Sequence, residues 1–391
     1  MKLVYLQQHF AMPNEPGFVR PWQFSKRFAQ EGFDVVAVRG GASAANERRD
    51  EVQVRTVSAT YANEMGFARR LFAFAQYLIK ATFHAWRERA GVVYASSGPL
   101  TVAVPALIAS LRPSTRLVFE VRDLWPDVPV ALGILRNPVL KHFATFLERL
   151  VYRSSDLIVC LSPDMEKGVK KVYPDANTVV VPNGCDFDLF QDAASQAVSK
   201  RLELGVGEDE ILVGYAGGFG YMYDLDWPVR LAGKLNEMGV RFFFIGHGSE
   251  SERLLDLADE IGLPRSVFLG LKSKTEVAEY LSAADVILSP LRDHQSLEAC
   301  SLNKVFDAMA AGKPVLFNHG GWLAEASTAI GGGWRLSRDL DSAIIEASVL
   351  LDGAKRDALN AAGARMRELG LAEFDRDRQF ELLINSVRSI L

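Results

Sequence analysis

Short runs of apolar, often β-branched residues alternate with longer amphipathic segments along this chain, and this alternation constrains the fold most. The first set of runs lies at 3–6, 35–38, 92–95, 117–121, 157–161 and 179–181. The pattern restarts after Asp188, with runs at 211–215, 242–245, 267–269, 286–288 and 314–317. Short strands separated by helices are typical of parallel βαβ units. The sequence therefore predicts an α/β fold with two doubly wound domains, residues 1–188 and 189–371.

The last residues of the chain predict one more helix. Apolar residues occupy one helical face there, at Phe380, Leu383, Ile384, Val387 and Leu391. A helix with one apolar face must pack against another part of the protein.

The charge of the chain argues against a nucleic acid partner. The net charge of the 391 residues is −4, with 44 Lys and Arg against 48 Asp and Glu. Residues 1–188 hold 23 of the basic and 18 of the acidic residues, a net of +5, which leaves −9 for the rest. A basic first half joined to an acidic second half is not the footprint of a nucleic-acid-binding domain.

The cysteines and the longest uncharged stretch indicate a cytoplasmic protein. Cys160, Cys185 and Cys300 are scattered and form no C-x-x-C pair, so reduced thiols are expected, and no zinc site. The N-terminus is too poor in apolar residues for a signal peptide. Residues 90–111 are uncharged, but Ser96-Ser97-Gly98-Pro99 interrupts them. We expect a buried strand, a turn and a helix there rather than a membrane span.

Loops that follow the strands are the places to search for ligand-binding residues. Gly17 lies in a Pro-Gly loop after the first strand, where a plain turn is the alternative. Gly217, Gly218, Phe219 and Gly220 follow the first strand of the second set. The glycines there would let backbone N–H groups reach a phosphate, or would simply make a tight turn. His247 follows the next strand as a ligand contact or a polar loop residue.

Two further segments combine charge with a strand end or a helix start. Asn303, Lys304 and Asp307 lie at the start of a helical pattern, where a cation and free N–H groups would neutralise a diphosphate. The alternative is an exposed Lys304–Asp307 ion pair on one helix face. Arg122 and Asp123 follow the apolar run 117–121. A charged cluster after a buried strand is a candidate functional site, and the alternative is that this segment, with the following Trp-Pro, only caps the core.

Residues 67–89 combine aromatic and basic side chains in a helical pattern. The residues that suggest contact with an anionic membrane are Arg69, Arg70, Phe72, Lys80 and Trp86. The alternative is an ordinary helix of the first domain whose Arg side chains extend to solvent.

These loops, in this order, resemble the retaining glycosyltransferases of family 4, which have the GT-B fold. The resemblance is carried by 120–127 (Glu-Val-Arg-Asp-Leu-Trp-Pro-Asp), 157–162, 181–186 and, most specifically, 301–315. It is nearest to the bacterial branch that builds surface polysaccharide. It implies a nucleotide-sugar donor on the second domain, an acceptor on the first and chemistry in the cleft between them. It also implies that the helix at 372–391 crosses back to the first domain, and that neither a metal nor a cofactor is needed.

The resemblance also assigns roles to single residues. Asp307 matches the second carboxylate of the family's Glu-x7-Glu motif, which holds the donor ribose. Asn303 and Lys304 match residues beside the diphosphate, and Leu271 and Lys272 match the nucleobase pocket.

The chain departs from the family's pattern at three places. Ala299 stands where the first motif carboxylate belongs, with Glu298 next to it. The loop at 217–224 carries no cation, and Arg122 aligns with the family's catalytic-region His. Arg122, Asp123 and Glu298 are therefore the catalytic candidates.

The function expected from these features is sugar transfer, with retention, from a nucleoside diphosphate sugar. UDP is the expected nucleotide, from the family's majority usage, and the acceptor would be a lipid-linked or other saccharide. The leaving phosphate would take the acceptor proton. The basic first half would lie on an anionic membrane at its cytoplasmic face. A GT-B sugar-nucleotide epimerase and a non-catalytic, degenerate transferase acting as a binding subunit are the alternatives.

Overall fold

The structure is a computed structural model that describes residues 1–12, 15, 20–59 and 67–391, excepting the side chains of 67–71 and 354. The chain forms two compact units, one of residues 1–182 and 379–391 and the other of residues 183–378. Each unit is a mainly parallel sheet with helices on its faces, which confirms the predicted fold class.

The division between the units falls after Pro182, whereas the sequence suggested Asp188. Asn183 belongs to the second unit because its backbone N–H donates to Ser301 Oγ at 3.2 Å and its side-chain amide donates to Ser301 O at 2.8 Å. Two residues later, the Cys185 N–H donates to Phe374 O at 2.7 Å.

The first unit is built on an eight-stranded sheet with the order β3-β4-β2-β1-β5-β6-β7-β8. Its strands are β1 (Lys2–Leu6), β2 (Asp34–Gly41), β3 (Ala45–Arg49), β4 (Val52–Ser58), β5 (Val92–Ser96), β6 (Arg116–Val121), β7 (Leu157–Cys160) and β8 (Thr178–Val180). All pairs are parallel except β3 with β4. The sequence did not predict the β3–β4 hairpin, because every residue of β3 is exposed and the strand has no apolar run.

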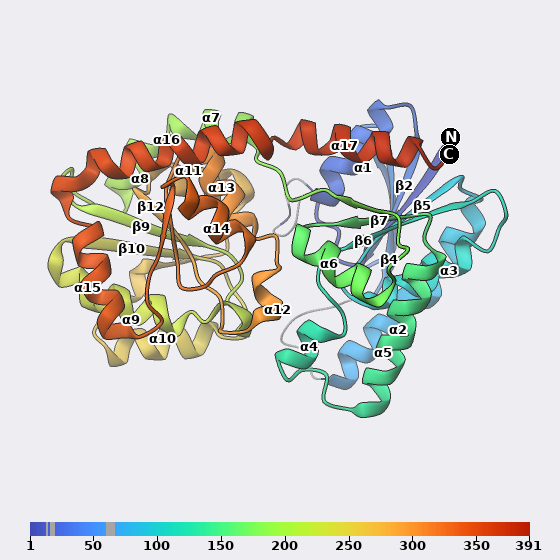
Figure 1. Cartoon of the computed structure of the whole chain (residues 1–391), viewed down its shortest axis with the longest axis horizontal. Helices are drawn as coiled ribbons and strands as arrows, with labels where there is room; N and C mark the ends of the chain where they lie inside the picture. The colour runs from blue at the N-terminus through green and yellow to red at the C-terminus, as the bar shows by residue number, and fades with distance from the viewer. Residues whose placement is uncertain (13–14, 16–19, 60–66) are drawn as a thin grey trace. The chain divides into compact units, whose positions relative to one another are not determined.

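The helices of the first unit are α1 (Arg20–Gln30), α2 (Phe67–Glu88), α3 (Ala103–Ala109), α4 (Asp127–Ala131), α5 (Pro138–Ser154), α6 (Pro163–Val172) and the C-terminal α17 (Arg376–Arg388). Within this unit, α17 lies beside α1, while α2 and α5 lie on the opposite side, each in contact with α3 (Figure 1). Phe380 of α17 packs against Phe24 and Phe28 of α1, with ring centroids 5.6 and 5.0 Å apart. The predicted apolar face therefore completes the core of the first unit, except for Leu391, which lies beyond the end of the helix and is 47% exposed.

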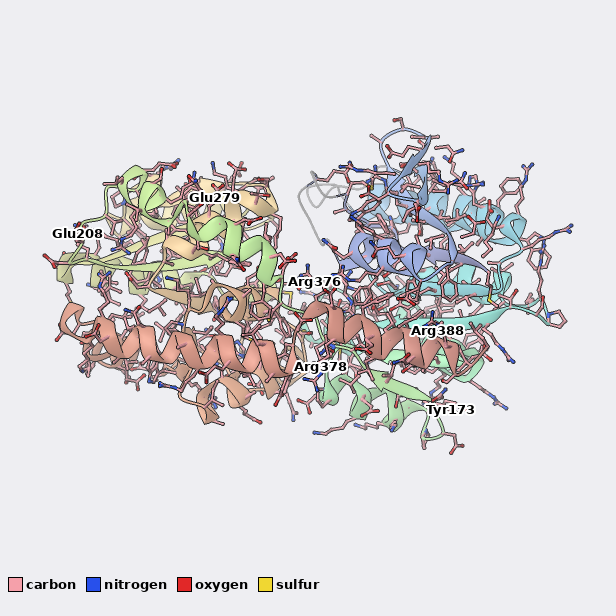
Figure 2. All side chains as sticks on the ribbon, turned by 90° about the horizontal axis from the view of Figure 1, so that it is seen from above. Tyr173, Glu208, Glu279, Arg376, Arg378 and Arg388 are labelled. Carbon is pink, nitrogen blue, oxygen red and sulfur yellow. The ribbon has the colours of Figure 1, made fainter. Side chains whose placement is uncertain are left out.

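Helix α17 begins in a segment held by the second unit. Arg376, labelled in Figure 2 with Arg388 at the other end of the helix, pairs with Asp186. It also donates to Gly184 O at 3.1 Å. A Cβ at Gly184 would lie only 2.6 Å from the Arg376 Cα, so this close approach requires glycine.

The second unit has an all-parallel sheet with the order β11-β10-β9-β12-β13-β14. Its strands are β9 (Ile211–Ala216), β10 (Val240–Ile245), β11 (Phe268–Gly270), β12 (Val286–Ser289), β13 (Val315–Phe317) and β14 (Gly333–Arg335). The chain reverses its direction of travel across the sheet between β9 and β12. In such sheets ligands bind at this switch point, beyond the carboxyl ends of the strands.

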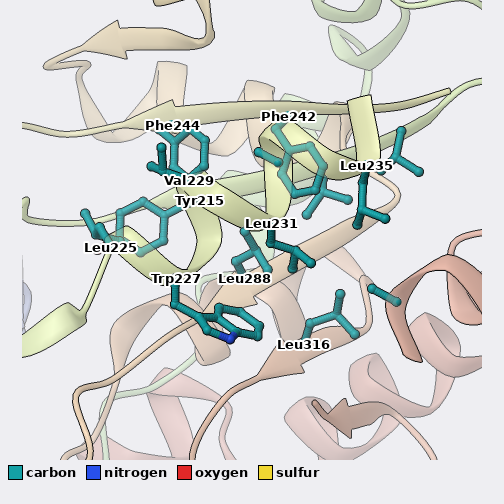
Figure 3. Packing of buried hydrophobic residues seen from close by; sticks show 14 of the residues in the cluster. Tyr215, Leu225, Trp227, Val229, Leu231, Leu235, Phe242, Phe244, Leu288 and Leu316 are labelled. Carbon is teal, nitrogen blue, oxygen red and sulfur yellow. The ribbon is translucent and has the colours of Figure 1, made fainter. Parts of the chain in front are cut away.

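Helices α7 (Phe187–Ala194) to α16 (Arg356–Glu373) cover this sheet. Those between are α8 (Ala197–Glu203), α9 (Asp226–Leu235), α10 (Ser251–Glu260), α11 (Lys274–Ala283), α12 (Gln295–Glu298), α13 (Asn303–Ala311), α14 (Trp322–Ala329) and α15 (Leu340–Leu350). Aromatic and aliphatic side chains fill the space between the sheet and α9, among them Tyr215, Trp227 and Phe244 (Figure 3). Tyr215 is the last of these along β9, so its hydroxyl reaches the switch point.

Residues 90–111 form β5, a single 3-10 turn at Leu100–Val102 and α3, as expected. Among the described residues, no helix combines the length and the apolar character that crossing a bilayer requires.

Candidate functional site

Lys304 is the central residue of the switch point in the second unit. It lies in the first turn of α13, and only 5% of its surface is exposed. Its ammonium group donates to Tyr215 Oη at 3.2 Å and lies 4.3 Å from the centroid of the Tyr215 ring. The Tyr223 ring lies 4.0 Å from the same group. Two aromatic faces and one hydroxyl therefore surround this cation.

The Lys304 ammonium group has no carboxylate partner among the described residues. Burial alone lowers its pKa from 10.5 to about 7, because the charged form loses water and gains no counter-charge. An anion beside Nζ would supply that counter-charge. Lys304 thus has the properties of an anion-binding residue that lacks its anion.

The glycine loop after β9 is held close to Lys304. Tyr215 Oη donates to Gly218 O at 2.9 Å, which ties the loop to the tyrosine. A Cβ at Gly217 would lie 2.9 Å from Tyr215 Oη and 3.3 Å from Lys304 Nζ. A Cβ at Gly246, in the loop after β10, would lie 1.9 Å from Gly217 O. Part of the glycine pattern is therefore explained by the close packing of these two loops.

The prediction that the N–H groups of the glycine loop reach a phosphate is wrong for part of the loop. The Gly217 N–H donates to Ile245 O and the Phe219 N–H to His247 O, both at 3.0 Å, so neither is left for a phosphate. The Phe219 side chain is core, with 3% of its surface exposed. In the described part of the chain, the N–H groups of Gly218 and Gly220 meet no backbone or side-chain acceptor. These two are the ones that remain for a ligand.

Asp307 lies one turn after Lys304 but contacts a different residue. Both of its carboxylate oxygens lie 2.6 Å from Nζ of Lys274, the first residue of α11. The alternative of a Lys304–Asp307 ion pair is therefore wrong. The sequence analysis missed Lys274, although Ser273 and Glu276 form a capping box whose S-x-x-E pattern marks a helix start.

The remaining predicted donor residues lie in loops around this edge. Leu271 and Lys272 join β11 to α11; Leu271 is 61% exposed, and Lys272 Nζ lies 3.6 Å from Glu276. His247 is exposed, with Nδ1 3.2 Å from Ser251 Oγ. Asn303 is half-buried at the first position of α13. Their ligand contacts stay predictions.

Three polar residues at the same edge were not singled out from the sequence. Ser289 ends β12, and Asn318 and His319 follow β13; each is at most 2% exposed. Ser289 Oγ, Asn318 Nδ2 and His319 Nε2 are buried without a hydrogen-bond partner in the described residues. Burial and the nearby Lys304 charge hold the pKa of His319 down, at about 4. The sequence signal that could have identified these three residues is a polar residue at or just after the end of a buried strand.

Glu298 contacts the loop after β13. Its Oε1 accepts the Gly320 N–H at 3.0 Å, and a Cβ at Gly321 would lie 2.4 Å from Glu298 O. The neighbouring Ala299 is 7% exposed. Glu298 therefore lies at the same loop as His319, and its catalytic role stays a prediction.

The candidates in the first unit lie at the end of β6. Arg122 and Asp123 are half-buried, and the Arg122 N–H donates to Ser97 Oγ at 2.8 Å. Just before them, Glu120 has no exposed surface, and its Oε2 accepts from Arg20 Nε at 3.1 Å and Arg20 Nη2 at 3.0 Å. Gly17 lies outside the described residues, and so do the side chains of Arg69 and Arg70.

Among the described residues, no group of three or more His, Cys, Asp or Glu side chains is placed to hold a metal ion. Lys304, the free glycine N–H groups and the unpartnered side chains at β12 and β13 together offer hydrogen-bond donors and one cation. Their chemistry suits a phosphorylated, hydroxyl-bearing ligand.

Two family models match the chain and together span most of it. The model described as "Glycosyl transferase 4-like domain" matches residues 19–184, and the one described as "Glycosyl transferases group 1" matches residues 210–347. The putative teichuronic acid biosynthesis glycosyltransferase TuaH of Bacillus subtilis is 25% identical over 217 residues, which are 54% of this chain and 52% of that protein. The chain spans about half the length of the curated relatives it matches.

Solved structures share the fold over the whole chain. Sucrose-phosphate synthase of Thermosynechococcus elongatus matches with a TM-score of 0.81 at 16% identity, covering 100% of this chain and 98% of that one. HepE (Alr3699) of Anabaena, solved with UDP-glucose, matches with a TM-score of 0.73 at 17% identity, covering 100% of both chains.

Proposed function

Since this chain belongs to the glycosyltransferases with the GT-B fold, we propose that it transfers a sugar from a nucleoside diphosphate sugar to a saccharide or lipid-linked acceptor. The product would be a bacterial surface polysaccharide, as the name of the relative TuaH suggests for that protein. The second unit binds the donor and the first unit binds the acceptor.

The buried ammonium group of Lys304 is the observation that carries this proposal. A lysine that is 5% exposed and unpaired is costly to a fold unless a ligand compensates for it. Transfer of the sugar leaves a nucleoside diphosphate on which negative charge develops. A cation fixed in a dry site stabilises that charge far better than one in water. Lys304 and the N–H groups of Gly218 and Gly220 supply this stabilisation.

The other residues of the site position the rest of the donor. Asp307, oriented by Lys274, accepts hydrogen bonds from the ribose hydroxyls, and the loop at Leu271 and Lys272 receives the nucleobase. Ser289, Asn318 and His319 hydrogen-bond the sugar or its phosphates, because their polar atoms lack protein partners. Asn303 and His247 flank the diphosphate. With the leaving phosphate taking the acceptor proton, transfer proceeds with retention and needs no protein base.

The nucleotide is proposed to be UDP. The similar fold of HepE was solved with UDP-glucose, which supports this choice without naming the sugar that this chain uses. In the first unit, Arg122 and Asp123 orient the acceptor. Exposed Phe72 and Trp86 on α2 bring that unit to the cytoplasmic face of an anionic membrane. Lys80 of the same helix is half-buried, and its ammonium group donates to Ser58 O at 2.6 Å.

A panel of ligands tests donor binding directly. A ligand that binds only the folded protein raises its melting temperature by mass action. UDP and UDP-sugars should raise it, and the variant Lys304→Met should lose most of that shift. If no nucleoside diphosphate or nucleotide sugar shifts the transition of the wild-type protein, the proposal is wrong.

Ala299 supports a second candidate, a subunit that binds a nucleotide sugar without transferring it. The motif carboxylate is replaced there by a methyl group that is 7% exposed. Release of nucleoside diphosphate in the presence of membrane extract separates the two. Tight donor binding without any release would favour the binding subunit over the enzyme.

A further inference from the structure

Helix α2 buries Tyr77 and several alanines and exposes four large apolar side chains. Ala73, Ala81 and Ala85 face the core, whereas Phe72 is 64%, Ile79 72%, Phe83 59% and Trp86 43% exposed. The exposed residues follow one another at intervals of seven, four and three positions and form one stripe along the helix. An ordinary surface helix carries polar residues on the side that faces solvent, so this apolar stripe needs a partner.

Helix α5 exposes a second apolar stripe. Val139 is 73%, Phe143 53%, Phe146 58% and Leu150 39% exposed, again at helical spacing. Only residues near the end of the helix are buried, such as Leu147 and Val151. Helices α2 and α5 lie on the same side of the first unit (Figure 1). We call the two stripes together the α2–α5 face.

The exposed charged side chains on the described part of α2 and α5, together with Arg89 just after α2, are all basic. Arg87, Arg89, Lys141, Arg149 and Arg153 are exposed. Residues 72–89 contain one acidic residue, Glu88, and residues 138–154 contain one, Glu148. Glu88 has a side chain that is 6% exposed and paired with Lys2 and Arg55, and Glu148 is 5% exposed. The described part of the face therefore presents cations and no exposed carboxylate.

We infer that the α2–α5 face is a bilayer-binding surface for anionic phospholipid, in which Phe143 and Phe146 of α5 enter the acyl region beside Ile79 and Phe83 of α2. Large apolar side chains ringed by cations match an anionic interface in both polarity and charge. A second copy of the chain would place the same cations opposite one another, which costs energy. The inference rests on the proposed function in that a lipid-linked acceptor lies in such a bilayer.

Co-sedimentation with vesicles tests this inference. The full chain should bind vesicles of equal phosphatidylcholine and phosphatidylglycerol, should bind pure phosphatidylcholine weakly, and should lose affinity as salt is raised. The double variant Phe143→Ser, Phe146→Ser should weaken binding at least about tenfold, since two aromatic side chains lose their apolar burial. Arg149→Glu with Arg153→Glu should weaken it and reduce its salt dependence.

A matched control comes from an apolar pair on the second unit. Ile345 and Val349 of α15 are 67% and 55% exposed, and Ile345→Ser with Val349→Ser should leave vesicle binding unchanged. The inference is overturned if anionic vesicles do not bind, if the α5 variants bind as well as the control, or if light scattering shows a dimer that the α5 variants dissociate.

Binding of UDP, measured on the same variants, separates this inference from the proposed function. Retained UDP binding with no vesicle binding in the wild type rejects the surface and leaves the transferase proposal standing. Vesicle binding without UDP binding supports the bilayer-binding surface and rejects the transferase proposal. Since the substituted side chains are exposed, the variants should melt at the temperature of the wild type.

Discussion

Each unit of this protein buries a charged side chain near the carboxyl edge of its sheet, Glu120 in the first and Lys304 in the second, and the two differ in their partners. In the first unit, the carboxylate of Glu120 is held by Arg20, by Tyr94 Oη at 2.7 Å and by Ser96 Oγ at 2.7 Å. Burial alone would raise the pKa of Glu120, but Arg20, Arg122 and these hydroxyls hold it below its usual value. In the second unit, Lys304 has two aromatic rings and one hydroxyl around it, and its pKa falls to about 7.

The difference indicates which charge belongs to the fold and which to a ligand. A buried charge with its full set of partners stabilises one arrangement of the chain, as Glu120 does when Arg20 also bonds the carbonyls of Val181 and Pro182. A buried charge without a counter-charge reduces stability and gains from an incoming anion. The comparison predicts that substitutions at Glu120 or Arg20 act on folding, and those at Lys304 act on binding and turnover.

Removing Arg20 should have the largest effect on stability. Arg20→Met leaves the Glu120 carboxylate buried and uncompensated, and we expect the free energy of unfolding to fall by about 3–5 kcal/mol. Chemical denaturation of the two proteins measures this loss. Because the pKa of folded Glu120 is depressed, its stabilisation is present above the unfolded pKa and is lost as the pH falls through the folded pKa.

Arg265→Met is the matched control for Arg20→Met. Arg265 pairs with Asp259 on the surface, with side chains that are 53% and 54% exposed. Such solvent-exposed pairs contribute little to stability, because water screens the two charges. Equal losses for Arg20→Met and Arg265→Met would contradict the structural role assigned to the buried pair.

Removing Lys304 should have the largest effect on turnover. Lys304→Met keeps the length of the side chain and removes the cation, so we expect nucleoside diphosphate release to fall about 10²–10³-fold. The free energy of unfolding should not fall, because the variant no longer buries an unpaired amine. Near-normal turnover of Lys304→Met, or a large loss of its stability, would contradict the claim that Lys304 serves a ligand whereas Glu120 serves the fold. Lys167→Met on α6, where the side chain is 78% exposed, is the control.

A smaller effect is expected at Asp307. Asp307→Asn keeps the shape of the side chain but removes the charge that Lys274 neutralises and weakens the proposed contacts with ribose. Loss of a hydrogen bond to a charged group costs about 1.5–3 kcal/mol, so UDP should bind roughly 10- to 100-fold more weakly. Inorganic pyrophosphate, which lacks ribose, is the control ligand. If Asp307→Asn weakens the binding of pyrophosphate as much as the binding of UDP, Asp307 has another role.

The sequence predicted the strands that carry apolar runs, because burial on both faces of a parallel sheet leaves a continuous hydrophobic signal. It missed β3, whose residues are all exposed, β4, which alternates buried and half-buried residues instead of forming an apolar run, and the short β14. At the candidate site, it identified Lys304 and Asp307 but not their partners. Spacing along one helix suggested that the two residues pair with each other. Their actual partners, Tyr215 and Lys274, lie 89 and 33 residues away, and only the tertiary fold brings them together.

The vesicle experiment extends the comparison to the surface of the first unit. There the unpartnered groups are apolar side chains rather than a buried charge, and the same reasoning assigns them to a lipid partner.

The pH dependence of UDP affinity in wild type and Lys304→Met tests the central claim most directly. If the Lys304 pKa in the free protein is about 7 and rises when a diphosphate binds, wild-type affinity should weaken as the pH increases above 7, by up to about tenfold per pH unit. Calorimetry in buffers of different ionisation enthalpy should show proton uptake in that range. The variant should bind weakly and lack this dependence, once the titration of UDP itself, common to both, is subtracted. Identical pH profiles for the two proteins would contradict the claim that Lys304 receives the diphosphate.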